Sequence, residues 1–214
     1  MAFSDRRRAG EQLALRLDSY RGHDPLILAV PRGGVAVAEP IWQNLGGEID
    51  LIITRKIGAP AQPELAIGAV SGDGFVIANE ELVARMNIPG DYIENKAAEE
   101  QAEIKRRLRL YRGNRPLPLV DNRLVILVDD GVATGYTLLA ALRSLRQQHP
   151  LKLVLAVPVG PPDTLTRLAE EVDELVYLEA PPNFAAVGQF YTRFDQVGDT
   201  EVMAVLQKAW TDQE

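Results

Sequence analysis

The sequence predicts an α/β fold built on a five-stranded, mainly parallel sheet flanked by helices. Short apolar runs without polar alternation begin near residues 26, 49, 124, 152 and 174, which is typical of parallel strands buried on both faces. The segments between them are mainly helical in pattern, which favours right-handed strand-helix-strand crossovers. With 214 residues, 46% of them hydrophobic, the chain can bury one full core. We therefore expect a single domain over residues 1–214, with a flexible loop or hairpin at 55–80 and a C-terminal hood or packing tail at 180–214.

Charge and composition argue against several classes of protein. The formal net charge of −7 disfavours a general nucleic-acid surface, because such surfaces need clustered Lys and Arg. The absence of cysteine excludes disulfides, thiolate catalysis and cysteine-based zinc sites. No apolar run approaches the ~20 residues that span a membrane, and the Arg-rich start lacks the apolar core of a signal peptide. We expect a cytoplasmic protein without membrane or nucleic-acid partners.

The chain opens with an amphipathic helix pattern over Phe3–Tyr20, in which Ser4 or Asp5 takes the N-cap position. The start of this helix carries a basic cluster, Arg6, Arg7 and Arg8. Charge runs usually face solvent, so a solvated role is favoured for the cluster, and a phosphate contact is the alternative.

A continuous apolar strand over Leu26–Val30 is followed by a tight loop and a helix over 35–45. The loop reads Pro31-Arg32-Gly33-Gly34. Its two glycines free the backbone for an anion nest, and Arg32 adds a planar fork of donors. A diphosphate group would fit this loop.

Two cations, Arg55 and Lys56, close the next predicted strand, Ile49–Thr54. Because open α/β sheets bind ligands at the carboxyl ends of their strands, anion contact is favoured over solvent exposure for this pair. Residues 58–64 are rich in Pro and Gly and predict a break in regular structure, and a hairpin joins 65–70 to 74–78. Glu64 and Asn79 are nearby polar groups for which solvent exposure is favoured over a role in a site.

A helical pattern covers Asn79–Tyr111, with an interruption at Pro89-Gly90. Its interleaved charges predict a solvated or partner-facing helix, and contact of its basic end with nucleic acid is disfavoured by the acidic balance. Residues 115–121 read as an extended connection into the next strand.

The segment Leu124–Thr137 carries the strongest chemical signal. Leu124–Val128 predicts a central strand that runs directly into Asp129 and Asp130, and a turn and a helix over 138–147 follow. Backbone N–H groups of the turn can wrap one phosphate at the helix start. They belong to Val132, Ala133, Thr134, Gly135, Tyr136 and Thr137. The two carboxylates cannot also face that phosphate, so we expect them to accept hydrogen bonds from vicinal ribose hydroxyls. The alternative is an ordinary strand-turn-helix with capping side chains.

Two further strands are predicted, Lys152–Val157 and Glu174–Leu178, around a helix over 163–171 with Asp163 as N-cap. The tail concentrates aromatic residues, Phe184, Phe190, Tyr191 and Phe194. They are suited either to a lid over a planar base or to core or dimer packing. A final helix, capped by Asp199, reaches Trp210.

Residues Leu124–Thr137 resemble the phosphoribosyl diphosphate (PRPP) signature of type I phosphoribosyltransferases: an apolar strand, two acids, two mostly apolar residues and then Ala-Thr-Gly-x-Thr. Arg32-Gly33-Gly34 is similar to the diphosphate loop of that family, and Arg55-Lys56 to its second diphosphate-contacting element. The resemblance also implies a mobile loop near 55–80 and base contacts after the last core strand. Most of the chain is similar to a bacterial group of predicted phosphoribosyltransferases whose base is not established.

This resemblance implies Mg²⁺-dependent displacement of diphosphate from C1 of PRPP by a nucleobase or a similar nitrogen nucleophile. Asp129 and Asp130 would hold the ribose diol and, directly or through water, the metal. Arg32, Arg55 and Lys56 would stabilise charge on the leaving group. The expected catalytic residues are thus Asp129, Asp130, Arg32 and Lys56, and the expected PRPP-binding residues add Gly33, Gly34, Arg55 and Val132–Thr137.

The acceptor and the alternatives are less narrowly defined. Ala133 stands where enzymes for 6-oxopurines typically place an Asp, so hypoxanthine and guanine are disfavoured, while adenine, uracil and other nitrogen nucleophiles stay open. The main competing hypothesis is a regulatory protein that senses PRPP or a nucleotide without turnover. Hydrolysis of a phosphorylated ribose is disfavoured, because no second carboxylate pair is evident. We also expect a homodimer and a role in nucleotide salvage.

Overall fold

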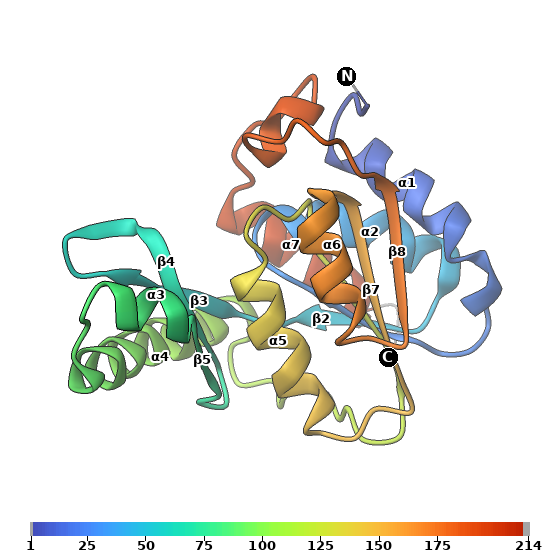
Figure 1. Ribbon diagram of the computed structural model, residues 1–214. Helices are drawn as coiled ribbons and strands as arrows, with labels where there is room; N and C mark the ends of the chain where they lie inside the picture. The colour runs from blue at the N-terminus through green and yellow to red at the C-terminus, as the bar shows by residue number, and fades with distance from the viewer. Residues whose placement is uncertain (1, 212–214) are drawn as a thin grey trace.

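The computed structural model describes residues 2–211, except the side chain of Glu64. A central sheet carries helices on both faces, and a smaller unit, residues 54–112, projects from one side of this core (Figure 1). We call residues 54–112 the module. The predictions that concern the Glu64 side chain, residue 1 and residues 212–214 lie outside the described part of the chain.

Five strands form the central sheet in the order β2-β1-β6-β7-β8, and every neighbouring pair is parallel. They are β1 (Leu26–Ala29), β2 (Glu48–Leu51), β6 (Leu124–Val128), β7 (Lys152–Val159) and β8 (Glu174–Glu179). In the middle of the sheet, β1 and β6 pair with Leu26 opposite Val125 and Ala29 opposite Val128. The prediction of a parallel five-stranded sheet is confirmed, because strands covered on both faces need continuous apolar runs.

Helices cover the two faces of the sheet separately. One face carries α1 (Arg6–Arg16), α2 (Gly33–Leu45) and α7 (Asp199–Thr211), and the other carries α5 (Tyr136–Arg146) and α6 (Pro162–Ala169). Two short 3₁₀ helices, η1 (Asp18–Tyr20) and η2 (Val187–Phe190), lie in connections. Successive residues of β6 serve opposite faces: Ile126 packs with the α1–α2 side and Leu127 with the α5–α6 side. The core is therefore a three-layer arrangement.

The module has its own antiparallel sheet in the order β3-β4-β5, backed by two helices. Its elements are β3 (Thr54–Ala59), β4 (Gln62–Ser71), β5 (Val76–Ala78), α3 (Glu80–Arg85) and α4 (Gly90–Arg112). The predicted hairpin and the helix break at Pro89-Gly90 are confirmed. Figure 1 shows α5 as the core helix beside the module, and the Ser144 hydroxyl of α5 donates to Oδ2 of Asp73 at 2.7 Å.

Two predictions about the strands of this region are wrong. The strand predicted to run through Thr54 ends at Leu51, and the chain then enters β3, so Arg55 and Lys56 lie inside a module strand. Residues 58–64 were predicted to be irregular but belong mostly to β3 and β4, where the ladder is bulged at Gly58. A Cβ at Gly58 would lie 2.3 Å from the Pro63 carbonyl oxygen, so Gly and Pro here mark a bulged hairpin end rather than a loop.

Two predicted helix caps also differ in the structure. The N-cap of α6 is Pro161, and Asp163 lies within the first turn, because a proline at the first helical position needs no amide partner. Asp199 is the first residue of α7, and its carboxylate accepts the Tyr111 hydroxyl at 2.6 Å. By contrast, Asp5 does cap α1, accepting the Arg8 amide at 2.9 Å.

A buried ion pair joins the module to the core. Arg112, at the end of α4, contacts Asp50 of β2, and the two side chains are only 2% and 1% exposed. Arg112 also donates to the Pro116 carbonyl through Nη2. Burial raises the pKa of Asp50 more than the Arg112 guanidinium lowers it. This connection between the module and the core is thus polar and desolvated. Removing one partner is costly, because it leaves the other charge buried and unpaired.

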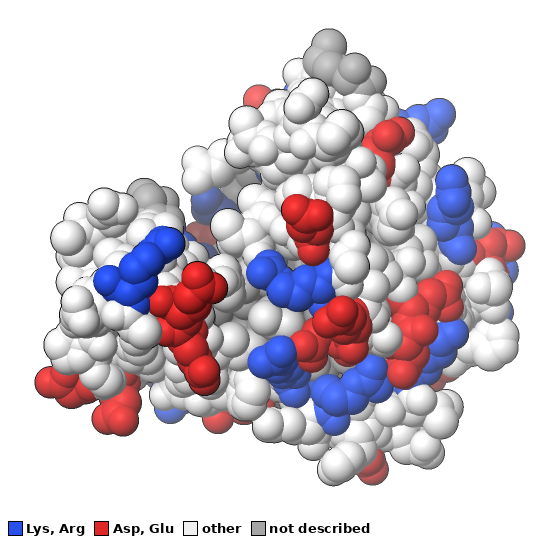
Figure 2. Space-filling view, in the orientation of Figure 1, with Lys and Arg blue, Asp and Glu red and all other residues white. Residues whose placement is uncertain are grey.

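Surface charge is mixed rather than segregated. On the face shown in Figure 2, Lys and Arg side chains are interspersed with Asp and Glu, and no basic stripe runs across it. None of the helices within residues 2–211 has the length and apolar character that a membrane span requires.

Candidate functional site

Two loops from neighbouring strands meet at the carboxyl edge of the sheet. Asp129 and Asp130 follow β6, and the Pro31–Gly34 loop follows β1. A Cβ at Gly33 would lie 1.9 Å from Oδ2 of Asp130, and one at Gly34 would lie 2.8 Å from the Val128 carbonyl oxygen. The two glycines are therefore required because the loop runs directly against the acidic pair. The peptide bond between Pro31 and Arg32 is cis.

The two carboxylates are desolvated neighbours. Oδ1 of Asp129 accepts the Asp130 amide at 2.8 Å. Burial raises the pKa of Asp129 well above its usual range, and the adjacent Asp130 charge adds to the rise. Burial also raises the pKa of Asp130, although the Arg6 guanidinium opposes it. Such a pair favours a ligand that supplies hydroxyl donors or positive charge.

The turn between β6 and α5 exposes backbone donors. Gly135 is the N-cap of α5 in the left-handed conformation, with φ of 77°. The Val132 amide donates to the Val159 carbonyl at 2.9 Å, which anchors the start of the turn. Over the part of the chain described, the amides of residues 133–137 have no hydrogen-bond partner. Unpaired amides at a helix start form an anion site in which both the donors and the helix dipole favour negative charge.

Helix α6 holds the outer side of this turn. The Thr164 hydroxyl donates to the Ala133 carbonyl at 2.8 Å, and Nη2 of Arg167 donates to the Thr134 carbonyl. The Arg167 guanidinium also lies 5.3 Å from the centroid of the Tyr136 ring. Because the carbonyls are held on the α6 side, the amides are left for the opposite side. We call residues 131–137 the amide turn.

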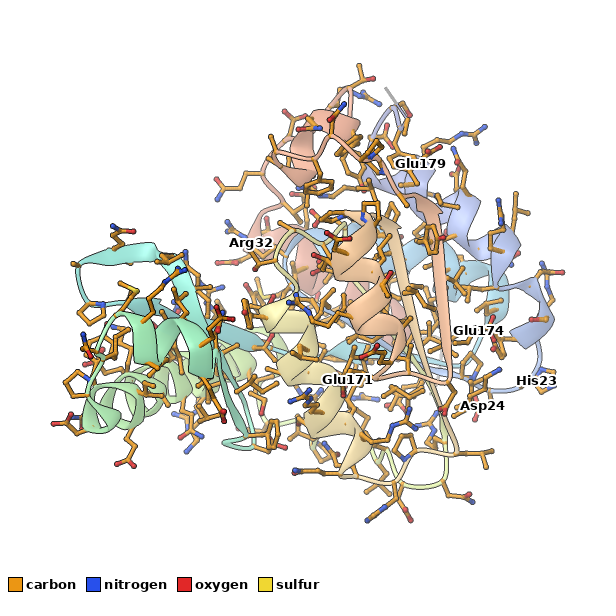
Figure 3. The ribbon with its side chains drawn as sticks, viewed as in Figure 1. His23, Asp24, Arg32, Glu171, Glu174 and Glu179 are labelled. Atoms are coloured by element: carbon orange, nitrogen blue, oxygen red, sulfur yellow. The ribbon has the colours of Figure 1, made fainter. Side chains whose placement is uncertain are left out.

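Arg32 takes a different direction from the one predicted. Its Nη1 lies 3.6 Å from Oδ1 of Asp199, and the two residues line a cavity of about 90 Å³ together with Tyr111, Arg106 and Arg107. In Figure 3, Arg32 lies on the side of the core that faces the module. The amides of Arg32 and Gly33 have no partner among residues 2–211, whereas the Gly34 amide donates to Val30 at 3.0 Å. Only part of the predicted anion nest is therefore available.

The other two predicted cations belong to the module. Nε of Arg55 donates to Oε2 of Glu100 in α4 at 2.6 Å, so its charge is matched within the module. Lys56, the next residue of β3, also has an interaction partner. The structure thus brings together Asp129, Asp130, the Arg32–Gly34 loop and the amide turn, and it pairs the Arg55 side chain with Glu100 of the module instead. The reason is that the chain leaves the central sheet at Leu51, before these cations.

Two residues outside the predicted set of site residues contact Asp130. Nε of Arg6 donates to Oδ2 of Asp130 at 2.7 Å, and the Tyr191 hydroxyl donates to the Asp130 carbonyl at 2.6 Å. Tyr191 is 4% exposed and its ring lies 5.3 Å from that of Phe3, so packing is its role. Burial raises the pKa of Tyr191 above its usual range. The basic cluster was a signal for Arg6, but the sequence could not show which of three arginines points inward.

One hollow of the described surface lies away from this edge. It has a volume of about 690 Å³ and is lined by residues that include His23, Asp24 and Glu174. Figure 3 shows these three at the opposite end of the core from Arg32. None of the predicted site residues lines it, so the candidate site is the carboxyl edge with its acidic pair and two glycine-containing loops.

An acidic strand end between two such loops, on a parallel five-stranded sheet, is the arrangement of a phosphoribosyltransferase. The phosphoribosyl transferase domain family matches residues 6–193, and the chain belongs to this family. It is 40% identical over 210 residues to Rv0571c of Mycobacterium tuberculosis, provisionally named a phosphoribosyl transferase, which covers 98% of this chain and 47% of the relative. The chain thus spans about half the length of that relative.

Two other proteins are similar over most of the chain. The bifunctional protein PyrR of Ralstonia nicotianae is 30% identical over 167 residues, which are 73% of this chain and 93% of that protein. The crystal structure of TT1426 from Thermus thermophilus is 41% identical, covers 97% of this chain and 99% of its own, and has a TM-score of 0.82. The family predicted from the PRPP-like signature is therefore confirmed.

Proposed function

We propose that the protein is a Mg²⁺-dependent phosphoribosyltransferase, which displaces diphosphate from PRPP by a nucleobase or a similar nitrogen nucleophile. The observation that supports this most directly is the amide turn, with its unpaired donors, next to the half-buried Asp129–Asp130 pair. PRPP carries its 5-phosphate and its vicinal hydroxyls on the same ribose. Backbone amides that bind the phosphate and carboxylates that bind the hydroxyls can therefore lie side by side in one site. The family membership supports the same reaction class.

In this proposal the amide turn holds the 5-phosphate. The free amides of residues 133–137 would donate to its oxygens, and Thr164 and Arg167 would keep the turn in the receptive conformation. Asp129 and Asp130 would accept hydrogen bonds from the ribose hydroxyls, which also relieves their desolvation. The chain's main contribution to rate would be the fixed orientation of C1 toward the acceptor.

Magnesium fits the residues at this edge only together with substrate oxygens. No cluster of three or more His, Asp or Glu side chains that could hold an ion occurs within the described residues. Mg²⁺ commonly binds through one or two carboxylates plus waters and substrate phosphates, and Asp129 and Asp130 can supply the carboxylate share. When bound, the ion would neutralise charge on the diphosphate.

The diphosphate would bind at the loop after β1. The amides of Arg32 and Gly33 are available, and the Arg32 guanidinium can turn toward the loop if it leaves Asp199. Arg55 and Lys56 stay candidates for contact with the leaving group. For Arg55, the ion pair with Glu100 would first have to open.

The test is release of diphosphate from PRPP with Mg²⁺ and a panel of bases, amines and amides. The proposal expects release only when an acceptor is present. Asp129→Asn combined with Asp130→Asn is expected to weaken PRPP binding, measured by calorimetry, because the ribose hydroxyls lose two charged acceptors. Unchanged affinity in that double variant would reject the diol role of the pair.

A PRPP-sensing regulatory protein without turnover is the second candidate. The observation that favours it is the pairing of Arg32 with Asp199 and of Arg55 with Glu100. These acids neutralise two cations that are expected at the leaving group. Both candidates predict PRPP binding. Binding with no diphosphate release across the whole acceptor panel would select the sensor.

A further inference from the structure

Three consecutive arginines at the start of α1 have different environments. Arg6 has a side chain that is 12% exposed and lies against Asp130. Arg7 and Arg8 are 55% and 65% exposed and pair with acids of α1 and α2 on the surface. A helix turns by about 100° per residue, so only one of three successive side chains can face the core edge. Arg6 is the one that faces the site.

The guanidinium of Arg6 joins three groups. Its Nε donates to Oδ2 of Asp130 at 2.7 Å, and its Nη1 donates to the Asp195 carbonyl at 2.6 Å. Its Cζ lies 3.7 Å from the centroid of the Phe194 ring, within cation–π range. The planar fork of an arginine can serve a carboxylate, a carbonyl and an aromatic face together, which a lysine cannot do.

Other contacts hold the tail beside α1 independently of Arg6. Backbone bonds run from the Thr192 amide to Phe3 at 2.8 Å and from the Arg193 amide to Ser4 at 2.9 Å. The Arg193 side chain also pairs with Asp5 at 2.5 Å. Past residue 193, Arg6 contacts Phe194 and Asp195, and the Phe194 ring also lies 5.0 Å from the ring of Tyr191. Loss of Arg6 should therefore loosen a local segment without unfolding the core.

Asp130 is constrained from the other side by the glycine loop. A Cβ at Gly33 would lie 1.9 Å from Oδ2 of Asp130 and 3.0 Å from Nε of Arg6. One carboxylate oxygen is thus enclosed by Arg6 and Gly33. The second oxygen, Oδ1, accepts no hydrogen bond from the described residues, so it is open to a ligand, and its direction depends on how Arg6 holds Oδ2.

We infer that Arg6 is a positioning residue of the site: it fixes Asp130 so that one oxygen addresses the ribose diol, and it fastens residues 194–195 beside that oxygen. This inference rests on the proposed function, because it assigns the held oxygen to a ribose hydroxyl. It makes α1 and the tail parts of one sugar-recognition unit, although they lie at opposite ends of the chain. The consequence is that sugar selectivity depends on a residue that need not touch the sugar.

The experiment compares ribose 5-phosphate with 2-deoxyribose 5-phosphate by calorimetry in the full chain. The wild-type protein is expected to prefer the ribose form by about tenfold, the usual contribution of one hydrogen bond to a charged group. Arg6→Gln is expected to bind the two sugars nearly equally, because Asp130 is no longer held. A merely structural effect would weaken both sugars in proportion and leave the preference intact, and that result would overturn the inference.

Arg8→Gln is the matched control, since it removes the same charge two residues away and is expected to keep the full preference. Arg6→Lys keeps the charge without the fork and is expected to recover only part of the preference. Full recovery in Arg6→Lys would show that charge alone suffices, which contradicts the positioning role. Thermal unfolding of each variant checks that the fold is retained.

Hydrogen exchange separates failure of this inference from failure of the proposed function. In the ligand-free protein, Arg6→Gln is expected to speed exchange of the Thr192 and Arg193 amides, whose hydrogen bonds to Phe3 and Ser4 adjoin residues 194–195, relative to Arg8→Gln, whatever the ligand is. If the wild type binds neither sugar phosphate, the proposed function fails, and this exchange difference still decides whether Arg6 fastens the tail. Equal exchange in the two variants would overturn the inference.

Discussion

Arg32, in the loop after β1, and Asp199, at the start of α7, face each other with Nη1 and Oδ1 3.6 Å apart. Asp199 is held in place by the Tyr111 hydroxyl of α4 at 2.6 Å. That hydrogen bond, together with Arg32, keeps the pKa of Asp199 below its usual range, so it is ionised at neutral pH. The arginine expected at the leaving diphosphate is thereby drawn toward the C-terminal helix and the module.

Asp199→Asn is expected to strengthen binding of diphosphate. The separation of 3.6 Å is too long for a hydrogen bond, and removing the charge frees Arg32 to turn toward its loop. The gain should be about twofold to fivefold, the range of one exposed ion pair, as measured by calorimetry with diphosphate. Asp91→Asn, which removes an exposed charge at the other end of α4, is the control and should change nothing. Weaker or unchanged binding in Asp199→Asn would show that Asp199 does not compete for Arg32.

Thr164→Val is expected to weaken binding of ribose 5-phosphate and to lower the free energy of unfolding by about 1 kcal/mol, because the Ala133 carbonyl loses its partner. The substitution keeps the shape of a side chain that is 9% exposed. Thr166→Val on the same helix removes an exposed hydroxyl that bonds within α6, and it should leave sugar binding unchanged. Equal binding by the two variants would argue against support of the amide turn by α6.

Arg112→Met is expected to destabilise the protein by about 3–5 kcal/mol at neutral pH, because it leaves Asp50 charged and buried without its partner. Urea denaturation measures this, with Arg109→Met as the control on an exposed position of the same helix.

The cost of Arg112→Met should depend on pH. Burial already raises the pKa of Asp50, and loss of the guanidinium raises it further. A carboxyl whose folded pKa lies above its unfolded value loses stability as the pH rises through that interval. The difference between variant and wild type should therefore shrink as the pH falls toward the ordinary value of 3.8. A cost that is constant over this range would contradict an ionised Asp50 in the variant.

Tyr136→Phe is expected to increase local opening of the module without unfolding the core. The Tyr136 hydroxyl accepts a hydrogen bond from the Asn79 amide group at the start of α3, so its loss should cost about 0.5–1.5 kcal/mol at that contact. Hydrogen exchange of β5 and α3 measures the effect. Tyr177→Phe, on a half-exposed residue of β8, is the control. Faster exchange spread evenly over the core would contradict a local role.

Much of the core could be predicted because its signals are local. The run Leu124–Val128 became β6 with the predicted bounds, and the other four core strands followed from similar runs. The module was harder, because Gly58 and Pro63 are read as loop residues although they sit at a bulged hairpin end. Gly and Pro mark both loops and β-bulges in a sequence. Only pairing with a partner strand shows which of the two is present.

The candidate site likewise has a part that local sequence predicts and a part that it does not. Asp129, Asp130 and the amide turn lie next to each other in the chain, so their order alone predicted a phosphate beside a diol. The sequence by itself thus determined the family, the parallel sheet and this contiguous part of the site, since each rests on the pattern within a short segment. Only the tertiary structure decided that Arg6 rather than Arg8 reaches Asp130, that Arg32 faces Asp199 and that Arg55 pairs with Glu100. These contacts join residues far apart in the chain, and their partners are set by how helices and strands pack, which no local pattern records.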